Sequence, residues 1–434
     1  MHEPGVWHEK ERPKSMTRLP SSLRGLPADL VLLFATRFTR LFAYGALSVV
    51  LVFYLVSLGL SEIQVGMLLT LTLAGDIAMS LWLTTRADRI GRRRMLVAGA
   101  LLMAGAGLTF ASTKNLFFLI VAGTIGVISP SGNEVGPFLS IEQAALSHLV
   151  AARSRTEVFA WYTLTGSIAT ALGALSGGAA AGMVQKASFS ASDSYRAVVL
   201  LYAALGVALA LLFTRLSSGA EGKPLEQAAS KASAWDFLGV ANSGSIVVKL
   251  SSLFALDAFG GGFVVQSFAA YWFYLRFAVA AEKLGLIFFC ANVFAGISAL
   301  LASRLASRIG LVRTMVVTHL PSNVLLILVP LMPNLSLAVL VLLARFSISQ
   351  MDVPTRQSYT MAVVRPEERS AAGGITGVAR TAGAAISPIF AGFLFSRPSW
   401  IDAPFFIAGT LKIAYDLILY RQFRAIRPPE ETKG

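Results

Sequence analysis

Two arginines and a tyrosine stand inside an apolar segment near the N-terminus. Arg37, Arg40 and Tyr44 are spaced three and four residues apart within residues 29–57, so on a helix they share one face. At about 1.5 Å per residue, Arg40 lies roughly 16 Å along the segment. Arginine presents a planar fork of donors, and the face predicts a site for a carboxylate, phosphate or similar oxyanion. The alternative is that Arg37 reaches the interface and serves only orientation.

Acidic residues occur in two further apolar segments. Glu134 and Glu142 lie in residues 116–146, and Asp257 lies in residues 247–275. Burial disfavours the ionised form of a carboxylate, so a buried carboxylate can bind and release a proton near neutral pH. We predict that Glu134 and Asp257 are proton-coupling residues. Structural pairing with a buried cation is the alternative for each.

A third group of charges lies in residues 336–361. Asp352 and Arg356 stand four residues apart, a spacing at which opposite charges pair on a helix. We predict that both belong to a substrate-binding site, and a purely structural ion pair is the alternative.

Helix-breaking residues surround these charges. Pro130, Gly132, Gly136 and Pro137 flank Glu134, and a proline also follows Asp352. Non-helical backbone at membrane depth is tolerated where it lines a cavity. The breaks therefore predict a cavity beside the charges, and kinks that serve only packing are the alternative.

The composition explains why such charges are conspicuous. Of the 434 residues, 55% are hydrophobic and 14% are charged, and the mean hydropathy is +0.67. Soluble proteins contain roughly 45–50% apolar and about 25% charged residues, so this chain is too apolar for a soluble protein of its length.

Apolar segments of membrane-spanning length recur along the whole chain. A spanning helix needs about 20 apolar residues. Twelve candidates occupy residues 29–57, 63–84, 95–111, 116–146, 157–183, 196–214, 247–275, 283–303, 314–332, 336–361, 371–394 and 402–421. The prediction is an all-α integral membrane protein of twelve transmembrane helices.

A polar, alanine-rich stretch, residues 217–245, divides these helices into two sets of six. The sets occupy residues 29–216 and 246–421, with polar tails at 1–28 and 422–434. The side that carries both tails and the linker holds 24 Lys and Arg residues in its loops, against six on the other side. Cytoplasmic loops carry this excess, so both termini are predicted to be cytoplasmic, in the cell (plasma or inner) membrane.

The two halves look like copies of one another. Residues 87–94 (ADRIGRRR) match residues 306–313 (ASRIGLVR) at five of eight positions, with an offset of 219. A second correspondence, with an offset of 214, places Gln143 on Gln357 and Glu142 on Arg356. Parallel six-helix repeats are typical of one large class of transporters.

The first repeated stretch resembles the signature of the major facilitator superfamily. That signature, Gly-x-x-x-Asp-Arg-x-Gly-Arg-Arg between helices 2 and 3, reads here Thr84-Thr-Arg-Ala-Asp88-Arg89-Ile-Gly91-Arg92-Arg93, with a threonine replacing the first glycine. The resemblance implies two six-helix bundles related by pseudo-two-fold symmetry, with helices 1, 4, 7 and 10 lining a central cavity. It also implies roles in conformational change for Asp88, Arg89, Gly91 and Arg92.

Two further likenesses concern single helices. Residues 173–178 (GALSGG) resemble the Gly-Pro-x-x-Gly-Gly signature of drug:proton antiporters but lack the proline. The alternative is that small residues let helices pack closely in lipid. The arginine that many exporters carry in helix 4 is absent, and Arg345 occupies a comparable position in residues 336–361.

Two pairs of opposite charges are predicted to form a gate. Repeat symmetry puts Glu142 and Arg356 at similar depth, and the superfamily fold makes the helices of Asp76 and Arg380 neighbours across the interface between the halves. We predict that one or both pairs close in the outward-open state and part when the cytoplasmic side opens.

These observations predict a secondary active transporter that works by alternating access. The preferred version is export of a small compound, anions included, coupled to inward proton flow. Proton-coupled uptake is the nearest alternative, and a transporter-like receptor or sensor is another.

Other classes of function are not expected. No nucleophile–base pair or metal-ligand set lies in the spans, so no enzymatic activity, cofactor or metal is expected. The basic residues lie in short runs between apolar segments, which excludes a nucleic-acid partner. The expected partners are a small-molecule substrate, protons and the lipid bilayer, and a monomer is expected.

Overall fold

The computed structural model describes residues 28–134, 138–150, 155–217, 243–365 and 368–426, without the side chains of residues 84–89, 147–148, 155–157 and 370. Within these ranges the regular structure is entirely helical. The first half contains α1 (Ala28–Ser57), α2 (Glu62–Ile90), α3 (Arg92–Ser112), α4 (Leu116–Ile125), α5 (Phe138–Leu149), α6 (Arg155–Lys186) and α7 (Ala191–Thr214). The second half contains α9 (Gly244–Gly262), α10 (Gln266–Phe277), α11 (Ala281–Ile309), α12 (Leu311–Leu328), α13 (Leu335–Ser349), α14 (Asp352–Ala362), α15 (Arg369–Phe395) and α16 (Ala403–Phe423).

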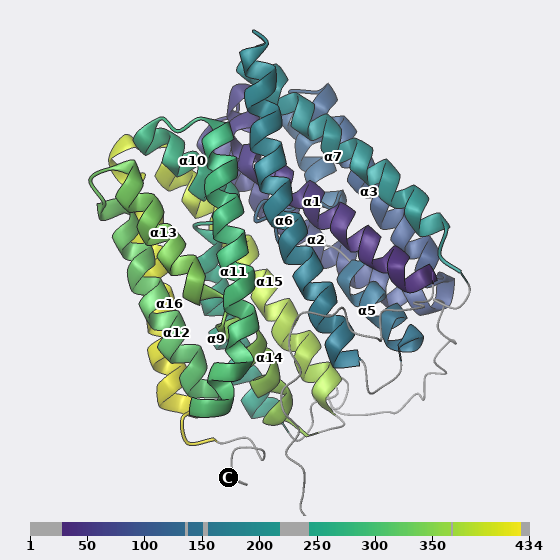
Figure 1. Cartoon of the computed structure of the whole chain (residues 1–434), viewed down its shortest axis with the longest axis vertical. Helices are drawn as coiled ribbons and strands as arrows, with labels where there is room; N and C mark the ends of the chain where they lie inside the picture. Colours follow the sequence, from purple (N-terminus) through teal and green to yellow (C-terminus); the bar gives the residue numbers. More distant parts are fainter. Residues whose placement is uncertain (1–27, 135–137, 151–154, 218–242, 366–367, 427–434) are drawn as a thin grey trace, which may run out of the picture.

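These helices make twelve spans in two bundles of six (Figure 1). Eleven stretches of the described chain are long and apolar enough to cross a membrane. The remaining span, the fourth, consists of the short apolar helix α4 followed by α5. The twelve-helix architecture predicted from the apolar segments is therefore confirmed.

Three spans consist of two helices each. Span 4 is broken between α4 and α5, where Pro130 and Gly132 lie, as predicted from the sequence. Span 10 is broken at residues 350–351, and Pro354 is the third residue of α14, in the first turn where a helix needs no N–H donor. The break of span 7 at residues 263–265 was not predicted.

Glycine makes the connection between spans 2 and 3 possible. Gly91 alone separates α2 from α3 and has a φ of 111°, and Gly310 alone separates α11 from α12 with a φ of 86°. Side chains disfavour this region of backbone space, whereas glycine adopts it freely. The signature glycine and its counterpart in the second half therefore occupy equivalent one-residue turns.

Two pairs of glycines let the bundles approach each other closely. A Cβ atom on Gly178 of α6 would lie 2.8 Å from the Cα of Gly285 on α11, and a Cβ atom on Gly66 of α2 would lie 3.0 Å from the Cα of Gly392 on α15. The offsets of 219 and 214 relate Gly66 to Gly285 and Gly178 to Gly392. The two glycine crossings are therefore equivalent under the internal symmetry.

The bundles are joined on the side of the molecule away from the linker. We call the ends of the spans at Ile90, Thr214, Gly244 and Arg369 the linker face, and the other ends the opposite face. Hydrogen bonds near the opposite face join Tyr271 to Glu62 at 2.8 Å, Gln266 to Ser48 at 2.8 Å and the Ile389 N–H to Thr70 at 3.0 Å. An ion pair joins Lys186 to Glu282 at 2.8 Å.

The bundles separate toward the linker face. In Figure 1, α6 and α11 approach each other near the top and diverge toward the bottom, where the linker face lies. On the linker-side half of α15, a Cβ atom added to Gly374 or Gly377 would meet no atom within 4 Å. The structure therefore describes a conformation closed on the opposite face and open on the linker face.

A bulky residue at a glycine crossing should open the closed face. Overpacking costs about 1–3 kcal/mol, so Gly178→Leu is expected to shift the equilibrium away from this conformation by roughly 5- to 150-fold. A Ser48→Cys reporter in a Cys290→Ser background, probed with an impermeant maleimide, measures the shift as faster labelling.

Gly105→Leu on α3 is the matched control, because that exposed glycine has no atom within 4 Å of its Cβ position. We expect its labelling rate to equal that of the parent protein. Equal rates for the Gly178 and Gly105 variants would show that the crossing does not hold the face closed.

Candidate functional site

Arg40 of α1 is neutralised by two carboxylates of span 4. Its two terminal nitrogens donate to the two oxygens of Glu142 at 2.9 and 2.7 Å, and its Nε donates to Glu134 at 2.8 Å. Arg37, one turn away, donates to the other oxygen of Glu134 at 2.6 Å. Bidentate guanidinium–carboxylate pairs are among the strongest polar contacts in proteins. The two arginines and two glutamates thus form a neutral cluster, the N-bundle network.

Glu142 is the most deeply enclosed member of this network. It also accepts hydrogen bonds from Thr36, at 2.9 Å, and from the hydroxyl of Tyr162 on α6. Its side chain and that of Arg40 are 0% exposed, whereas Glu134, in the non-helical part of span 4, is 15% exposed. Glu134 is therefore the carboxylate of the network that water and solutes reach most easily.

Tyr44 occupies the core of the first bundle. It is fully buried on α1, and its ring stacks on Tyr202 of α7 with the centroids 6.4 Å apart. It continues the helix face of Arg37 and Arg40, as its spacing requires.

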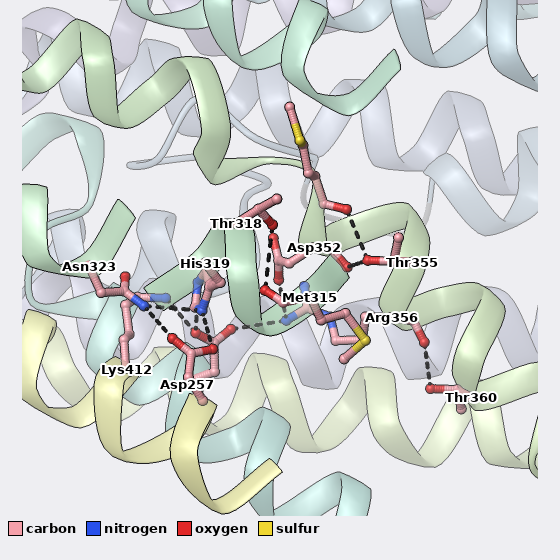
Figure 2. Close-up of polar contacts among 12 residues, drawn as sticks. Asp257, Met315, Thr318, His319, Asn323, Asp352, Thr355, Arg356, Thr360 and Lys412 are labelled. Atoms are coloured by element: carbon pink, nitrogen blue, oxygen red, sulfur yellow. Dashed lines mark hydrogen bonds and ion pairs between the residues drawn. The ribbon is translucent and has the colours of Figure 1, made fainter. Parts of the chain in front are cut away.

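Asp257 of α9 is the centre of a second network in the other bundle (Figure 2). One of its oxygens bonds the ammonium group of Lys412 at 2.5 Å, and the other bonds Arg356 at 3.0 Å. The same terminal nitrogen of Arg356 lies 3.2 Å from Asp352. The structure thus brings together Asp257, Asp352 and Arg356, three of the residues selected from the sequence, and adds Lys412. We call this cluster, with the histidine described next, the C-bundle network.

His319 of α12 extends this network to the last span. Its Nδ1 lies 2.8 Å from Asp416, and its Nε2 lies 3.6 Å from Asp257 (Figure 2 labels His319 and Asp257). The Asn323 amide donates to the other oxygen of Asp416 at 2.9 Å. The imidazole therefore lies between two buried carboxylates.

Sequence reasoning missed the residues of spans 9 and 12. Lys412 and Asp416 stand four residues apart in an apolar segment, which is the signal that selected Asp352 and Arg356. His319 was the only ionisable side chain within residues 314–332. The rule that intramembrane ionisable residues are functional candidates would have selected all three.

The two networks occupy equivalent places with opposite signs. In the first bundle span 1 supplies the arginine and span 4 the carboxylate, and in the second bundle span 7 supplies the carboxylate and span 10 the arginine. Glu142 and Arg356 are related by the repeat offset of 214. The internal duplication has kept the ion pair and exchanged its charges.

The predicted gate residues do not pair with each other in this conformation. Glu142 bonds Arg40 and Arg356 bonds Asp257, so each belongs to the network of its own bundle. No ion pair joins the described side chains of Asp76 and Arg380. Because the linker face is open, the closure of either pair stays a prediction.

The signature residues are described only in part. Asp88 and Arg89 belong to α2, but their side chains lie outside the described residues. Arg92 is buried at the start of α3.

The C-bundle network also contains a set of metal-ligand types. One ligand atom from each of Asp257, His319 and Asp352 lies within 4.8 Å of the other two. Both oxygens of Asp257 already bond cations, from Lys412 and Arg356. A divalent ion there would face two fixed positive charges at close range, so these residues fit an ion-pair network better than a metal site.

The fold and sequence comparisons agree on the class of protein. The family model of the Major Facilitator Superfamily matches residues 33–344 and 250–434. An uncharacterized membrane protein of Saccharomyces cerevisiae, YJR124C, is 32% identical over 425 residues, covering 92% of this chain and 94% of the relative. The chain therefore belongs to the Major Facilitator Superfamily and is a membrane transporter.

Solved structures of transporters share the fold. A bacterial homologue of the human lysosomal transporter Spinster, in an inward-facing and unoccupied conformation, aligns with a TM-score of 0.70 at 14% identity, covering 92% of this chain and 97% of that one. The nucleoside transporter NupG aligns with a TM-score of 0.70 at 13% identity, covering 92% and 100%.

Removing a charge from the buried pair of the N-bundle network should destabilise the protein. Breaking a buried ion pair on one side costs about 3–5 kcal/mol, because the remaining charge is left uncompensated. Glu142→Gln is therefore expected to lower the unfolding midpoint of the purified protein in detergent by several degrees.

Glu282→Gln is the control, since it breaks the ion pair between Glu282 and Lys186. The side chain of Glu282 is 49% exposed and that of Lys186 is 70% exposed. Exposed pairs contribute about 0–1 kcal/mol. Equal shifts in the two variants would contradict the assignment of Arg40 and Glu142 as a costly buried pair.

Proposed function

We propose that this transporter is a proton-coupled secondary carrier of small solutes that works by alternating access. The observation that carries the proposal is the pair of buried networks on spans 1 and 4 and on spans 7 and 10. Charge inside a bilayer is expensive, and it is retained where a transport pathway needs it.

The linker face is proposed to be cytoplasmic, in the plasma membrane or a bacterial inner membrane. The excess of Lys and Arg on that side supports this orientation, and with it the described conformation is open to the cytoplasm. The similarity to the inward-facing Spinster homologue supports the same assignment. Outward opening then requires the glycine crossings to separate while the linker-side ends of the bundles close.

Glu134 and Asp257 are proposed to carry the coupling proton. Glu134 is the one carboxylate bonded to Arg37 among the described side chains, and it also accepts from the Nε of Arg40. Asp257 holds Arg356 and Lys412. Protonation of either carboxylate would leave buried cations without their counter-charge, which changes the relative free energy of the two conformations.

The solute is proposed to bind between the networks, with contributions from Arg37, Arg40, Tyr44, Asp352 and Arg356. The donors of Arg37 and Arg40 are occupied by glutamates in this conformation. An anionic solute would reach them when Glu134 releases its contacts, as protonation would cause. Joint binding of solute and proton in that bundle suits coupled uptake, whereas export requires the solute to bind as the proton leaves.

Export is the proposed direction, and the likeness of residues 173–178 to the antiporter signature supports it. Gly173 and Gly177 pack against the backbone of α1, and Gly178 packs against α11, so close packing alone also accounts for these glycines. Coupled uptake through the same networks is therefore the second candidate.

Neutralising the coupling carboxylates should separate transport from the proton gradient. In Glu134→Gln and Asp257→Asn, proton-driven accumulation is expected to be lost while solute exchange survives, because each change keeps the size of the side chain and removes its titration. Vesicles of both orientations, read with a pH-sensitive dye and a panel of solutes, test this and also determine the direction.

The control variant Glu282→Gln should retain uphill transport, because it neutralises a carboxylate that is exposed and outside both networks. If the Glu134 and Asp257 variants both concentrate solute against its gradient, the proton is carried elsewhere or not at all. Binding of solutes without transport by the wild type would instead indicate a receptor.

A further inference from the structure

Two arginines near the C-bundle network make no ion pair with a described residue. Arg345 of α13 shares the buried helix face of Ala338, Leu342 and Ser349, and its guanidinium lies 5.0 Å from the ring centroid of its neighbour Phe346. The Nε of Arg345 and that of Arg380 on α15 are both buried without a hydrogen-bond partner among the described side chains and backbone.

Both arginines lie near the middle of the membrane. Arg345 is ten residues from the start of α13 at the opposite face, and Arg380 is eleven residues from the start of α15 at the linker face. At about 1.5 Å per residue these positions are roughly 15 and 16 Å deep, against a hydrocarbon core of about 30 Å. A cation at this depth needs a counter-charge.

The nearby carboxylates are already engaged. Arg345 and Arg380 approach Asp257 and Asp352 from two different helices and interact electrostatically with both. Asp257 bonds Lys412 and Arg356, Asp352 bonds Arg356, and Asp416 accepts from His319 and Asn323. Four permanent cations, Arg345, Arg356, Arg380 and Lys412, thus face three carboxylates.

The excess positive charge distinguishes this bundle from the other one. In the N-bundle network two arginines meet two glutamates, and every carboxylate oxygen accepts from an arginine. Around the C-bundle network Arg380 instead also experiences repulsion from Arg356. An anion bound by either guanidinium would supply the counter-charge that its Nε lacks, and at Arg380 it would also offset the repulsion from Arg356.

We propose that Arg345 and Arg380 form the oxyanion-binding subsite of this carrier, which takes the carboxylate or phosphate group of a small organic anion. The proposal rests on the carrier function proposed above and names its substrate class. Guanidinium forks bind planar carboxylates and phosphates through paired hydrogen bonds. The subsite lies in the second bundle, whereas the arginines of the first bundle are held by their own glutamates.

The test measures anion binding to the purified full-length protein in detergent, by the rise of its unfolding midpoint at constant ionic strength. Succinate and inorganic phosphate are the two probes, and chloride is the background anion. We expect saturable stabilisation by at least one probe, and the stronger probe distinguishes a carboxylate site from a phosphate site. A charge-assisted contact contributes about tenfold or more in affinity, so Arg345→Gln and Arg380→Gln should each weaken binding by that factor.

Conservative and control variants keep the test decisive. Arg345→Lys and Arg380→Lys keep the charge but not the fork, so they should also weaken binding, and they replace the glutamine variants if those do not fold. Arg397→Gln, an exposed arginine stacked on Phe393 and Trp400, should bind like the wild type.

Stabilisation of the wild type by neither probe, or unchanged affinity in the Arg345 and Arg380 variants, would overturn the subsite. Proton-driven transport of a neutral solute by a protein that binds neither anion would leave the carrier function intact and remove only the subsite. Anion binding through Arg345 and Arg380 without any transport would support the subsite and contradict the proposed carrier function.

Discussion

The need to neutralise charge inside a bilayer governs this structure. In the first bundle Arg37, Arg40, Glu134 and Glu142 each bond a partner of opposite charge on another span. In the second bundle Arg356 and Lys412 both bond Asp257 from other spans, whereas Arg345 and Arg380 make no ion pair with a described residue. Such contacts tie spans 1, 4 and 5 together in one bundle and spans 7, 9, 10 and 12 in the other. Spans 4, 7 and 10 can therefore be broken without separating, because their charges hold them to their neighbours.

The networks are confined to single bundles, and this has a consequence for movement. The contacts found between the bundles include hydrogen bonds, glycine crossings, apolar contacts such as Phe53 on Tyr271 and Tyr274, and one exposed ion pair. Among the described side chains, a relative rotation of the bundles therefore breaks no buried ion pair. A change of charge in one network therefore leaves the ion pairs of the other network intact.

Much of the fold could be predicted from the sequence, because spans of apolar residues and the repeated ADRIGRRR stretch are local patterns. The break of span 4 was visible in its prolines and glycines. The break of span 7 was not, since the glycines at 260–262 also suit packing. The pairing of Arg40 with Glu142 joins residues 102 positions apart, and the sequence offered Arg356 as an equally plausible partner. Lys412, Asp416 and His319 could also have been predicted, because each is an ionisable side chain within an apolar segment. The family resemblance pointed to spans 1, 4, 7 and 10 instead.

The glycine crossings also determine what the bundles must reorganise when they part. At Gly66 with Gly392 and Gly178 with Gly285, the atoms nearest to each glycine's Cβ position are backbone atoms of the other helix. Burying a long side chain costs up to about 2 kcal/mol in rotamer freedom, and at these points there is none to gain or lose. Opening at the crossings therefore involves little change in side-chain entropy, so its free-energy cost there comes from the backbone contacts that are lost rather than from side chains that are freed.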